Sequence, residues 1–318
     1  MNQKNYIESV VIGLGNIGML YDYHKDDKVF THSKAIEIHP SFNLSAGIDI
    51  CKKKRKLFEK KYHKPAYCKI EDLLETSKEF SFFSISTPAN LHKETYNKIL
   101  QFNPKIVLCE KPVGRTYKEA FEISKASKIY KIKTYVNFIR RFDKSIRKLK
   151  QWILLGNLGK LRKVVAKYSG GIKNNASHLI DLIFFLIGDN VNPEKVQIIN
   201  LKKNDDKDFL LLINNEISLF FLSMDTNNYE SLELELLFTE GKIVIEDGGK
   251  KINIYRSTND TNFSKYKILI QSDIKFHFDL DKYQYSVLEC ISENCKPNIS
   301  NALVVSKIVE KILRELNE

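Results

Sequence analysis

The chain has 318 residues, of which 43% are hydrophobic and 28% charged, and its formal net charge is +12. This length favours two domains, and no apolar run approaches the roughly 20 residues that a membrane span needs. The lysines are spread along the chain and interleaved with acids, as in KKNDDKD at 202–208, whereas a nucleic-acid footprint concentrates basic residues on one element. We therefore expect neither a nucleic-acid partner nor a membrane partner.

The N-terminus and the cysteines indicate a cytoplasmic protein. MNQKNYIESVVIG lacks the basic start and the long apolar region of a signal peptide. The five cysteines show neither the spacing of disulfide pairs nor that of metal ligands; they are Cys51, Cys68, Cys109, Cys290 and Cys295. We therefore expect reduced thiols, a cytoplasmic location and no metal site.

Strand and helix patterns alternate through the first 140 residues. Helical stretches, the clearest being KKKRKLFEKKY at 52–62, separate β-type runs at 8–15, 42–49, 65–70, 80–87, 105–110 and 133–139. Short strands separated by helices indicate a parallel sheet covered on both faces. We therefore predict an α/β domain with a doubly wound parallel sheet over residues 1–140.

The second half has a different pattern. A helix near 144–155 and a strand at 161–169 precede an apolar helix that begins in IKNNASHLID at 172–181. Five runs of alternating apolar and polar residues follow, at 196–201, 208–213, 217–224, 232–238 and 242–247. The short turns between them favour an antiparallel sheet. We therefore predict an α+β domain over residues 141–318 with a large, mostly antiparallel open sheet, whose last helix can pack back toward the first domain.

VVIGLGNIG at 10–18 is a candidate dinucleotide site. Its G-x-G-x-x-G pattern falls on Gly13, Gly15 and Gly18, after a strand and at the start of a helix. The first glycine allows a tight turn, the second lets the backbone approach a pyrophosphate, and the third lets the helix pack against the sheet. We predict a Rossmann-type cofactor site that includes Asn16 and Ile17; the alternative is a structural turn.

Asp49 ends the second predicted strand, where a carboxylate can accept both ribose hydroxyls of an adenosine. It lies 31 residues beyond Gly18, whereas about 20 residues usually separate the fingerprint from its acidic residue. The extra length, at 21–36, indicates an insertion in the first crossover. Because a carboxylate repels a 2′-phosphate, we predict NAD rather than NADP, although the basic run at 52–55 follows closely. The alternative is an exposed aspartate at a strand end.

Two further runs follow strands on the same side of the predicted sheet. STPANLH at 86–92 follows the fourth strand, and EKP at 110–112 follows the fifth. Open α/β sheets bind ligands at this edge. A lysine at a strand end is usually a solvated surface residue, but one held between glutamate and proline at this edge is a candidate site residue.

Several motifs occur in an order that resembles one known family. They are GLGNIG at 13–18, the strand-end Asp49, STPANLH at 86–92, EKP at 110–112, NFIRRFD at 137–143 and HLID at 178–181. Together they resemble the glucose–fructose oxidoreductase/inositol dehydrogenase (Gfo/Idh/MocA) family over most of the chain. The resemblance implies an NAD(P)-dependent oxidoreductase that acts on a sugar or polyol. It also implies a homodimer or homotetramer that is assembled through the second domain's sheet.

The resemblance implies roles for individual residues. Lys111 would be catalytic or would orient the substrate, because an ammonium beside a hydroxyl stabilises a developing alkoxide. The cofactor would be contacted by Ser86, Thr87, Pro88, Asn90, His92, Glu110 and Lys111, and the substrate by Lys111, Asn137, Arg140, Arg141, Asn174 and His178. A free catalytic base is the alternative for His92. Surface arginines or an interdomain salt bridge are the alternatives for Arg140 and Arg141, which would otherwise meet substrate phosphates.

The second-domain motif of the family commonly has the form D-x-G-x-H-x-x-D, and this chain departs from it. Aligned on His178 and Asp181, the first aspartate is replaced by Asn174 and the glycine by Ala176. An amide cannot accept a proton, so the acid–base role falls to His178 with Lys111 as partner. The alternative is a core histidine that is satisfied by Asp181.

Asparagine before the histidine bears on both substrate and function. Asn175 is a candidate N-cap for the helix that carries His178. Family members with asparagine at the position of Asn174 resemble 3-dehydrogenases of nucleotide-linked sugars, which favours such a substrate here. The same departure leaves a second hypothesis open, a dinucleotide- or sugar-sensing regulator that does not turn over.

Overall fold

The computed structural model describes residues 6–200, 207–213, 216–224, 229–263 and 265–316. Leu201, the last residue of one predicted strand, and the N-terminal residues MNQKN at 1–5 lie outside this described part. The fold divides into two compact units: the chain up to Ile139 with Asp281–Ser306, and Arg140–Leu280 with the residues from Lys307 onward. Residues 281–306, which we expected in the second domain, therefore group with the first unit. No helix of the described ranges combines the length and apolar character needed to cross a bilayer.

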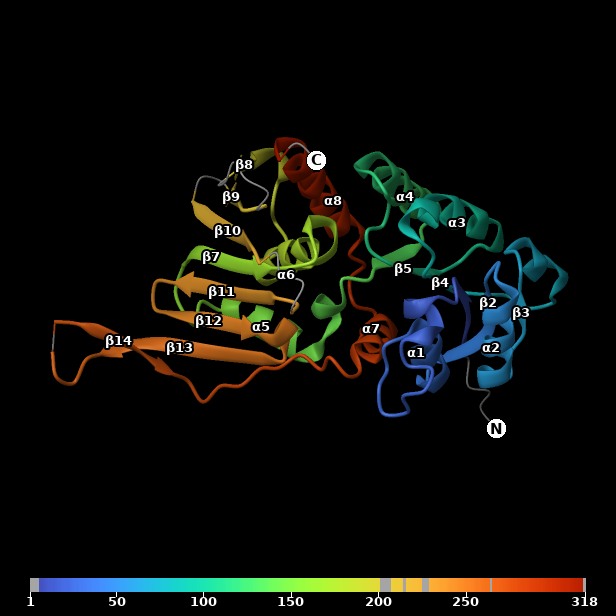
Figure 1. The fold of residues 1–318 in the computed structure, drawn as a ribbon, viewed down its shortest axis with the longest axis horizontal. Coiled ribbons are helices and arrows are strands. Elements are labelled where there is room, and N and C mark those ends of the chain that lie inside the picture. Colours follow the sequence, from blue (N-terminus) through green and yellow to red (C-terminus); the bar gives the residue numbers. More distant parts are fainter. Residues whose placement is uncertain (1–5, 201–206, 214–215, 225–228, 264, 317–318) are drawn as a thin grey trace. The chain divides into compact units, whose positions relative to one another are not determined.

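A six-stranded parallel sheet forms the centre of the first unit (Figure 1). Its strands are β1 (Ile7–Ile12), β2 (Phe42–Ile48), β3 (Ala66–Tyr67), β4 (Phe82–Ile85), β5 (Ile106–Cys109) and β6 (Lys133–Val136), in the spatial order β3-β2-β1-β4-β5-β6. All described neighbours pair in parallel. The predicted α/β class is confirmed. The strand order reverses at β1 and β4, the place where such sheets bind ligands.

Most helices of the first unit connect these strands, and the last two come later in the chain. They are α1 (His32–Ile38), α2 (Lys52–Tyr62), α3 (His92–Ile99), α4 (Tyr117–Ile129) and α7 (Tyr283–Ser292), and α8 (Ile299–Glu315) begins in this unit. The lysine-rich run predicted as a helix is α2, which buries Phe58 and Tyr62. The helix expected after the glycine motif is only a five-residue π-helical turn, Asn16–Leu20. An inserted loop then leads to α1.

Cys290 and Cys295 form a disulfide where α7 ends. The expectation of reduced thiols is therefore wrong for these two residues. The chain reverses at Asn294, which has a positive φ of 57°. The N–H of Cys295 then donates to the carbonyl of Cys290 at 3.0 Å, which brings the two Cα atoms to 5.4 Å. This contact depends on a local turn that residue spacing does not reveal.

An eight-stranded sheet forms the second unit (Figure 1). The strands are β7 (Leu161–Tyr168), β8 (Val196–Asn200), β9 (Phe209–Ile213), β10 (Ile217–Ser223), β11 (Leu232–Phe238), β12 (Gly241–Glu246), β13 (Lys251–Asn259) and β14 (Lys267–Gln271), in the order β14-β13-β12-β11-β7-β10-β9-β8. The mostly antiparallel sheet is confirmed. It is not a simple meander, since β7 lies between β11 and β10 and pairs in parallel with β10.

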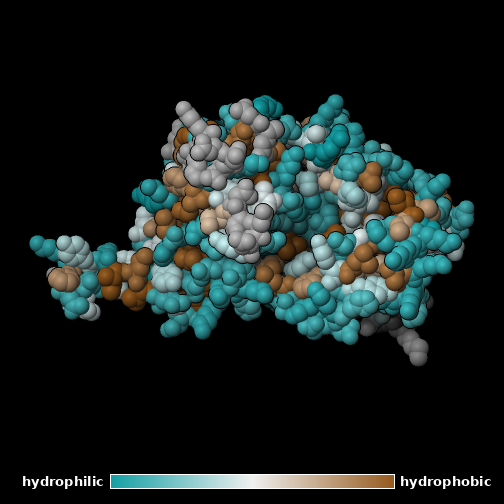
Figure 2. Space-filling view, in the orientation of Figure 1, coloured by the Kyte–Doolittle hydropathy of each residue, from teal (hydrophilic) through white to brown (hydrophobic). Residues whose placement is uncertain are grey.

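Two helices of this unit matter for the candidate site. They are α5 (Lys144–Leu154), whose first amides are capped by the Asp143 carboxylate, and α6 (Ser177–Leu186), which is nearly all buried. Alternate residues of β9, β11 and β12 are buried, as expected for a sheet with one covered face. Apolar side chains of the β13–β14 hairpin are exposed (Figure 2), among them Ile268, Leu269 and Ile270.

Candidate active site

The glycine motif forms a tight turn against the ends of β1 and β4. Gly13 has a φ of +94°, and a Cβ there would lie 2.7 Å from the backbone of Ser86. A Cβ on Gly18 would lie 1.9 Å from the Gly13 carbonyl oxygen. These two positions therefore need glycine for the fold itself. Gly15 differs, because the one atom near its added Cβ would be the Lys54 ammonium at 3.9 Å. The backbone at Gly15 is thus open to a ligand, which fits a pyrophosphate.

The carboxylate of Asp49 lies beside this turn. It accepts hydrogen bonds from the N–H of Leu14 at 2.9 Å and the N–H of Cys51 at 2.8 Å. The ammonium of Lys54 lies 3.5 Å from one carboxylate oxygen. Asp49 therefore joins the glycine turn to the start of α2, where it stands next to a cation.

Ser86 and Thr87 follow β4. The Ser86 hydroxyl donates to the Gly13 carbonyl at 2.7 Å and so holds the glycine turn against β4. The Thr87 hydroxyl oxygen is buried and has no hydrogen-bond partner within the described ranges. Buried polar atoms are normally paired, so the Thr87 hydroxyl fits a polar group of a bound ligand. Pro88 and Asn90 are exposed.

His92 is fully buried at the start of α3. One ring nitrogen lies 2.9 Å from the carbonyl oxygen of Pro112 and the other 2.8 Å from that of Thr87. Burial lowers the pKa of His92, and the two carbonyl oxygens act in the opposite direction. The ring thus lies between STPANLH and EKP, and each of its nitrogens faces a carbonyl oxygen of one of these segments. This arrangement disfavours a free catalytic base.

Glu110 and Lys111 follow β5, and the Lys111–Pro112 peptide bond is cis. One Glu110 carboxylate oxygen lies 2.9 Å from His32 Nε2 and 2.6 Å from Asn137 Nδ2. The other accepts the backbone N–H of Lys111 at 3.2 Å. Burial alone would raise the pKa of Glu110, but these donors and the Lys111 charge bring that pKa below its ordinary value. Glu110 is therefore an anion that already accepts three hydrogen bonds.

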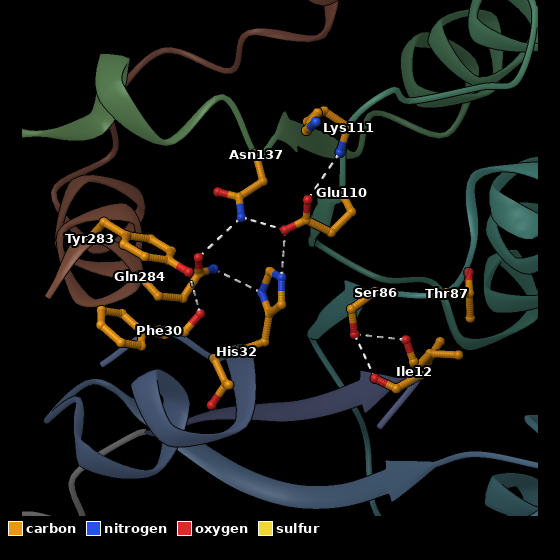
Figure 3. A network of polar contacts seen from close by, with 12 residues as sticks. Ile12, Phe30, His32, Ser86, Thr87, Glu110, Lys111, Asn137, Tyr283 and Gln284 are labelled. Carbon is orange, nitrogen blue, oxygen red and sulfur yellow. Dashed lines mark hydrogen bonds and ion pairs between the residues drawn. The ribbon is translucent and has the colours of Figure 1, made fainter. Parts of the chain in front are cut away.

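Gln284 of α7 closes these contacts into a ring of four side chains (Figure 3). Its amide nitrogen lies 2.8 Å from His32 Nδ1, and its oxygen accepts from Asn137 Nδ2 at 3.1 Å. An ionised Glu110 can only accept, so His32 carries its proton on Nε2 and Asn137 presents its amide nitrogen. Gln284 then donates to His32. One charge fixes the direction of every bond in the ring.

The inserted loop holds His32 in place. The Asp22 carboxylate, fully buried, accepts the N–H groups of Phe30 and Thr31 at 2.6 and 2.9 Å, as well as the Thr31 hydroxyl at 2.7 Å. The Tyr283 hydroxyl donates to the Phe30 carbonyl at 2.9 Å, and the two rings stack (Figure 3). We did not predict His32 or Gln284 from the sequence. His32 follows Thr31, a capping residue within the predicted insertion, whereas no sequence pattern marks Gln284.

The second unit carries the remaining predicted residues. A π-helical turn, Ile172–Ala176, runs into α6. Asn175 lies inside this turn, so its predicted role as the N-cap is wrong: the helical path begins four residues earlier than the apolar pattern indicates. Asn174 is exposed, and His178 is half-buried in the first turn of α6.

Arg141 and Asp181 form a buried ion pair in this unit. Nε of Arg141 donates at 2.9 Å to one carboxylate oxygen of Asp181, and a terminal nitrogen donates to the other at 2.7 Å. Asp189 lies 3.3 Å from the same terminal nitrogen. Asp181, which lies three residues after His178 on α6, therefore uses both carboxylate oxygens to bind Arg141. Arg140, its neighbour in the chain, is also buried, and its Nε donates to the Gly248 carbonyl at 2.8 Å.

The predicted site residues thus fall into two groups. The first unit holds Gly13, Gly15, Asn16, Ile17, Gly18, Asp49, Ser86, Thr87, Pro88, Asn90, His92, Glu110, Lys111 and Asn137, and the second holds Arg140, Arg141, Asn174 and His178. Within the first unit, the cofactor candidates lie along the carboxyl ends of the parallel strands. The open backbone of Gly15 and the buried Thr87 hydroxyl fit a dinucleotide along this edge.

Comparison with known proteins agrees with this geometry. The family described as "Oxidoreductase family, NAD-binding Rossmann fold" (GFO_IDH_MocA) matches residues 7–138. An uncharacterised oxidoreductase of Schizosaccharomyces pombe is 37% identical over 95 residues, 30% of this chain and 25% of that protein. The rhizopine catabolism protein MocA of Rhizobium meliloti is 34% identical over 90 residues, 28% of each chain. The matched regions thus span about a quarter of these relatives.

Solved structures resemble the chain over nearly its whole length. An oxidoreductase from Agrobacterium radiobacter in complex with NAD+, L-tartaric acid and magnesium has a TM-score of 0.69 at 15% identity, covering 96% of this chain and 94% of the other. A 3-ketoreductase from Actinomadura kijaniata in complex with TDP-benzene and NADP scores 0.71 at 14% identity, covering 96% of both. A putative myo-inositol dehydrogenase from Sinorhizobium meliloti scores 0.72 at 16% identity, covering 98% and 97%.

At these identities the solved structures show the fold, and their complexes contain both NAD and NADP. The family match lies in the first unit, where the matched residues include the glycine turn, Asp49 and the EKP segment. Residues 7–138 match the model of the Gfo/Idh/MocA oxidoreductase family with an NAD-binding Rossmann fold.

Proposed function

We propose that the protein is an NAD-dependent dehydrogenase that acts on a secondary alcohol of a sugar or a nucleotide-linked sugar. The observation that carries the proposal is the position of Lys111: it lies two residues after the end of β5, and its backbone N–H donates to the Glu110 carboxylate at 3.2 Å. The open Gly15 backbone stands in the same unit, at the end of β1. A cation next to a dinucleotide edge is suited to stabilising the charge that develops on an alcohol oxygen as its hydride leaves.

The proposal assigns one proton-accepting group. The nicotinamide ring of a bound cofactor would accept or donate the hydride. Glu110 is a poor base because its carboxylate already accepts three hydrogen bonds. Asn174 carries an amide, which takes up no proton. We therefore assign proton transfer to His178 and orientation of the hydroxyl oxygen to Lys111. The Asn174 amide would bind a substrate hydroxyl or amide.

NAD is proposed in preference to NADP. The Asp49 carboxylate lies beside the glycine turn, where an adenosine ribose would lie, and an anion there opposes a 2′-phosphate. Lys54, at 3.5 Å from this carboxylate, reduces the preference without reversing it. The two carboxylate oxygens already accept backbone N–H groups, so Asp49 keeps its position when the ribose arrives.

A sugar or nucleotide-linked sugar is proposed from two sources. Asn174 replaces the usual carboxylate in a pattern that resembles 3-dehydrogenases of such sugars. Among the structures of the same fold are a 3-ketoreductase with bound TDP-benzene and a putative myo-inositol dehydrogenase. Both descriptions are compatible with a substrate that carries several hydroxyl groups.

The proposed protein is a cytoplasmic homodimer or homotetramer that binds neither nucleic acid nor membrane. The β13–β14 hairpin supports assembly through the second unit's sheet, because its Ile268, Leu269 and Ile270 side chains are exposed at the sheet edge. Exposed apolar patches on sheet edges commonly mark protein interfaces. Light scattering would test this by measuring the molar mass of the protein over a 10-fold range of concentration. A monomeric mass at every concentration would contradict the assembly.

A regulator that binds the dinucleotide or a sugar without turnover is the second candidate, and Asn174 is the residue that favours it. The two candidates are separated by absorbance at 340 nm during incubation of the full chain with NAD and a panel of sugars, inositols and nucleotide-linked sugars. Mass spectrometry of compounds that co-purify with the protein would guide the panel. NADH formation supports the dehydrogenase; tight NAD binding with no NADH formed on any co-purifying sugar supports the regulator.

A further inference from the structure

Arg140 and Arg141 are adjacent in the chain but differ in how their charges are balanced. Arg141 donates to both oxygens of Asp181 and also contacts Asp189. Arg140 is 8% exposed and, among the described residues, makes one hydrogen bond, from Nε to the Gly248 carbonyl. Its guanidinium carbon lies 5.6 Å from the centre of the Phe278 ring. Across the residues that the structure describes, no carboxylate lies within ion-pair distance of Arg140.

The acidic residues around Arg140 are engaged elsewhere. Asp143 accepts the N–H groups of Ser145 and Ile146 at the start of α5. Asp181 pairs with Arg141. In the turn that contacts Arg140, Asp247 lies 2.8 Å from Lys251 instead. Lys150 takes the second oxygen of Asp189 at 2.9 Å. Arg141 and Lys150 thus occupy the carboxylates of Asp181 and Asp189, and among the described residues the positive charge of Arg140 is left without an ion pair.

A buried guanidinium without a carboxylate is costly for the fold, because removing a charge from water is not compensated. Burial accordingly lowers the pKa of Arg140 to about 10, against the opposing influence of Asp181. The group is still charged at neutral pH. Residues that are unfavourable for the fold are commonly retained for binding or catalysis.

The geometry leaves the terminal nitrogens of Arg140 for a ligand. Nε is used by Gly248, and the glycine at that position lets the guanidinium lie close, since an added Cβ there would lie 3.3 Å from a terminal nitrogen. The Gly248 carbonyl and the Phe278 ring hold the planar group from two sides. A planar group held in this way presents a pair of parallel donors, which matches a carboxylate or a phosphate.

We propose that Arg140 binds an anionic group of the substrate, a carboxylate or a phosphate, while Arg141 has a structural role. The inference rests on the proposed function and narrows its substrate class to acidic or phosphorylated sugars. Arg141, the next residue in the chain, contacts Asp181, which lies on α6 three residues after His178. The anion-binding group and the proposed base therefore belong to neighbouring elements of the same unit.

Two probes separate the sources of the anion. The full chain, saturated with NADH so that the dinucleotide site is filled, is titrated in a calorimeter with uridine diphosphate and, separately, with D-glucuronate. We expect one probe to bind the wild type and Arg140→Met to weaken it by about 10-fold or more, the scale of a lost charge-assisted pair. Arg140→Lys should restore part of the affinity, because it keeps the charge without the paired donors.

Arg162→Met is the matched control, since it removes the same charge from an exposed position of β7. Its affinity for the probe should stay within about 2-fold of the wild type, as for a screened surface charge. Equal losses in Arg140→Met and Arg162→Met, no loss in Arg140→Met, or no binding of either probe to the wild type would overturn the inference. The NADH titration in the same samples tests the proposed function separately: no NADH binding contradicts that proposal, whereas anion binding that is independent of Arg140 contradicts the inference alone.

Discussion

The pair formed by Arg141 and Asp181 gives a sharp test of how the second unit is held together. Asp181→Asn keeps the size of the side chain but leaves the Arg141 guanidinium, 5% exposed, without its main partner. Removing one partner of a buried pair usually costs about 3–5 kcal/mol. Asp189 remains 3.3 Å from one nitrogen, so we expect the lower end of that range, about 3 kcal/mol of unfolding free energy.

Urea unfolding followed by tryptophan fluorescence measures this loss directly. Trp152 is the single tryptophan of the chain and lies on α5, so it reports on the second unit. Glu233→Gln is the matched control, because it breaks the ion pair between Lys167 and Glu233, whose side chains are 48% and 41% exposed, respectively. It should lower the unfolding free energy by less than about 1 kcal/mol. A loss in Asp181→Asn no larger than in the control would refute the reasoning. The double variant Arg141→Met/Asp181→Leu should be more stable than Asp181→Asn, because neither charge remains buried.

Three further predictions concern the first unit. Gly15→Ala should fold normally, since the atom nearest to the added Cβ would be the Lys54 ammonium at 3.9 Å. It should weaken NADH binding by about 10-fold, because the backbone can no longer approach a pyrophosphate. Unchanged NADH affinity in a fluorescence titration would show that the turn is only structural. Asp49→Ser should lower the ratio of the NADPH to the NADH dissociation constant by about 10-fold, because it removes a like charge from the 2′-phosphate; an unaltered ratio would place the adenosine ribose elsewhere. Because the pKa of Glu110 lies below its ordinary value of 4.5 in the folded state, the stability from its ionised form is present above pH 4.5 and is lost as the pH falls further. Wild-type stability should therefore decline more steeply than that of Glu110→Gln between pH 5 and pH 3, and parallel declines would argue against an ionised Glu110.

Much of the fold follows from local pattern. The lysine-rich helix α2 spans the predicted residues because Phe58 and Tyr62 supply a buried stripe and the lysines a solvated face. The six parallel strands follow from short apolar runs that alternate with helical segments. In the second unit, alternation predicted β8 to β12, but pairing order is a long-range property. The position of β7 between β11 and β10 could not be derived from the runs themselves.

The candidate site divides in the same way. Gly13, Gly18 and Asp49 could be predicted because local patterns mark them: the two glycines belong to one G-x-G-x-x-G motif after a strand, and Asp49 ends the next strand. The ring through His32, Glu110, Asn137 and Gln284 could not, since the contact between His32 and Gln284 joins residues 252 positions apart.

Pair contacts were equally hidden. Asp181 was a candidate partner of His178 from its spacing, whereas both its oxygens bind Arg141, which is 40 residues away in the sequence. The disulfide of Cys290 and Cys295 depends on the left-handed turn at Asn294, which neither composition nor spacing marks. Side-chain partners on different elements are set by the three-dimensional fold, which local sequence patterns do not encode.

The central claim is hydride transfer assisted by Lys111 and His178, and one comparison tests it most directly. Turnover of NAD with a sugar identified by co-purification is measured at 340 nm for the wild type, Lys111→Ala and His178→Ala, together with the NADH dissociation constant of each. We predict that each variant lowers turnover by about 100-fold or more, the scale of an acid–base group, while NADH affinity changes little. Near-normal turnover in both variants would contradict the account.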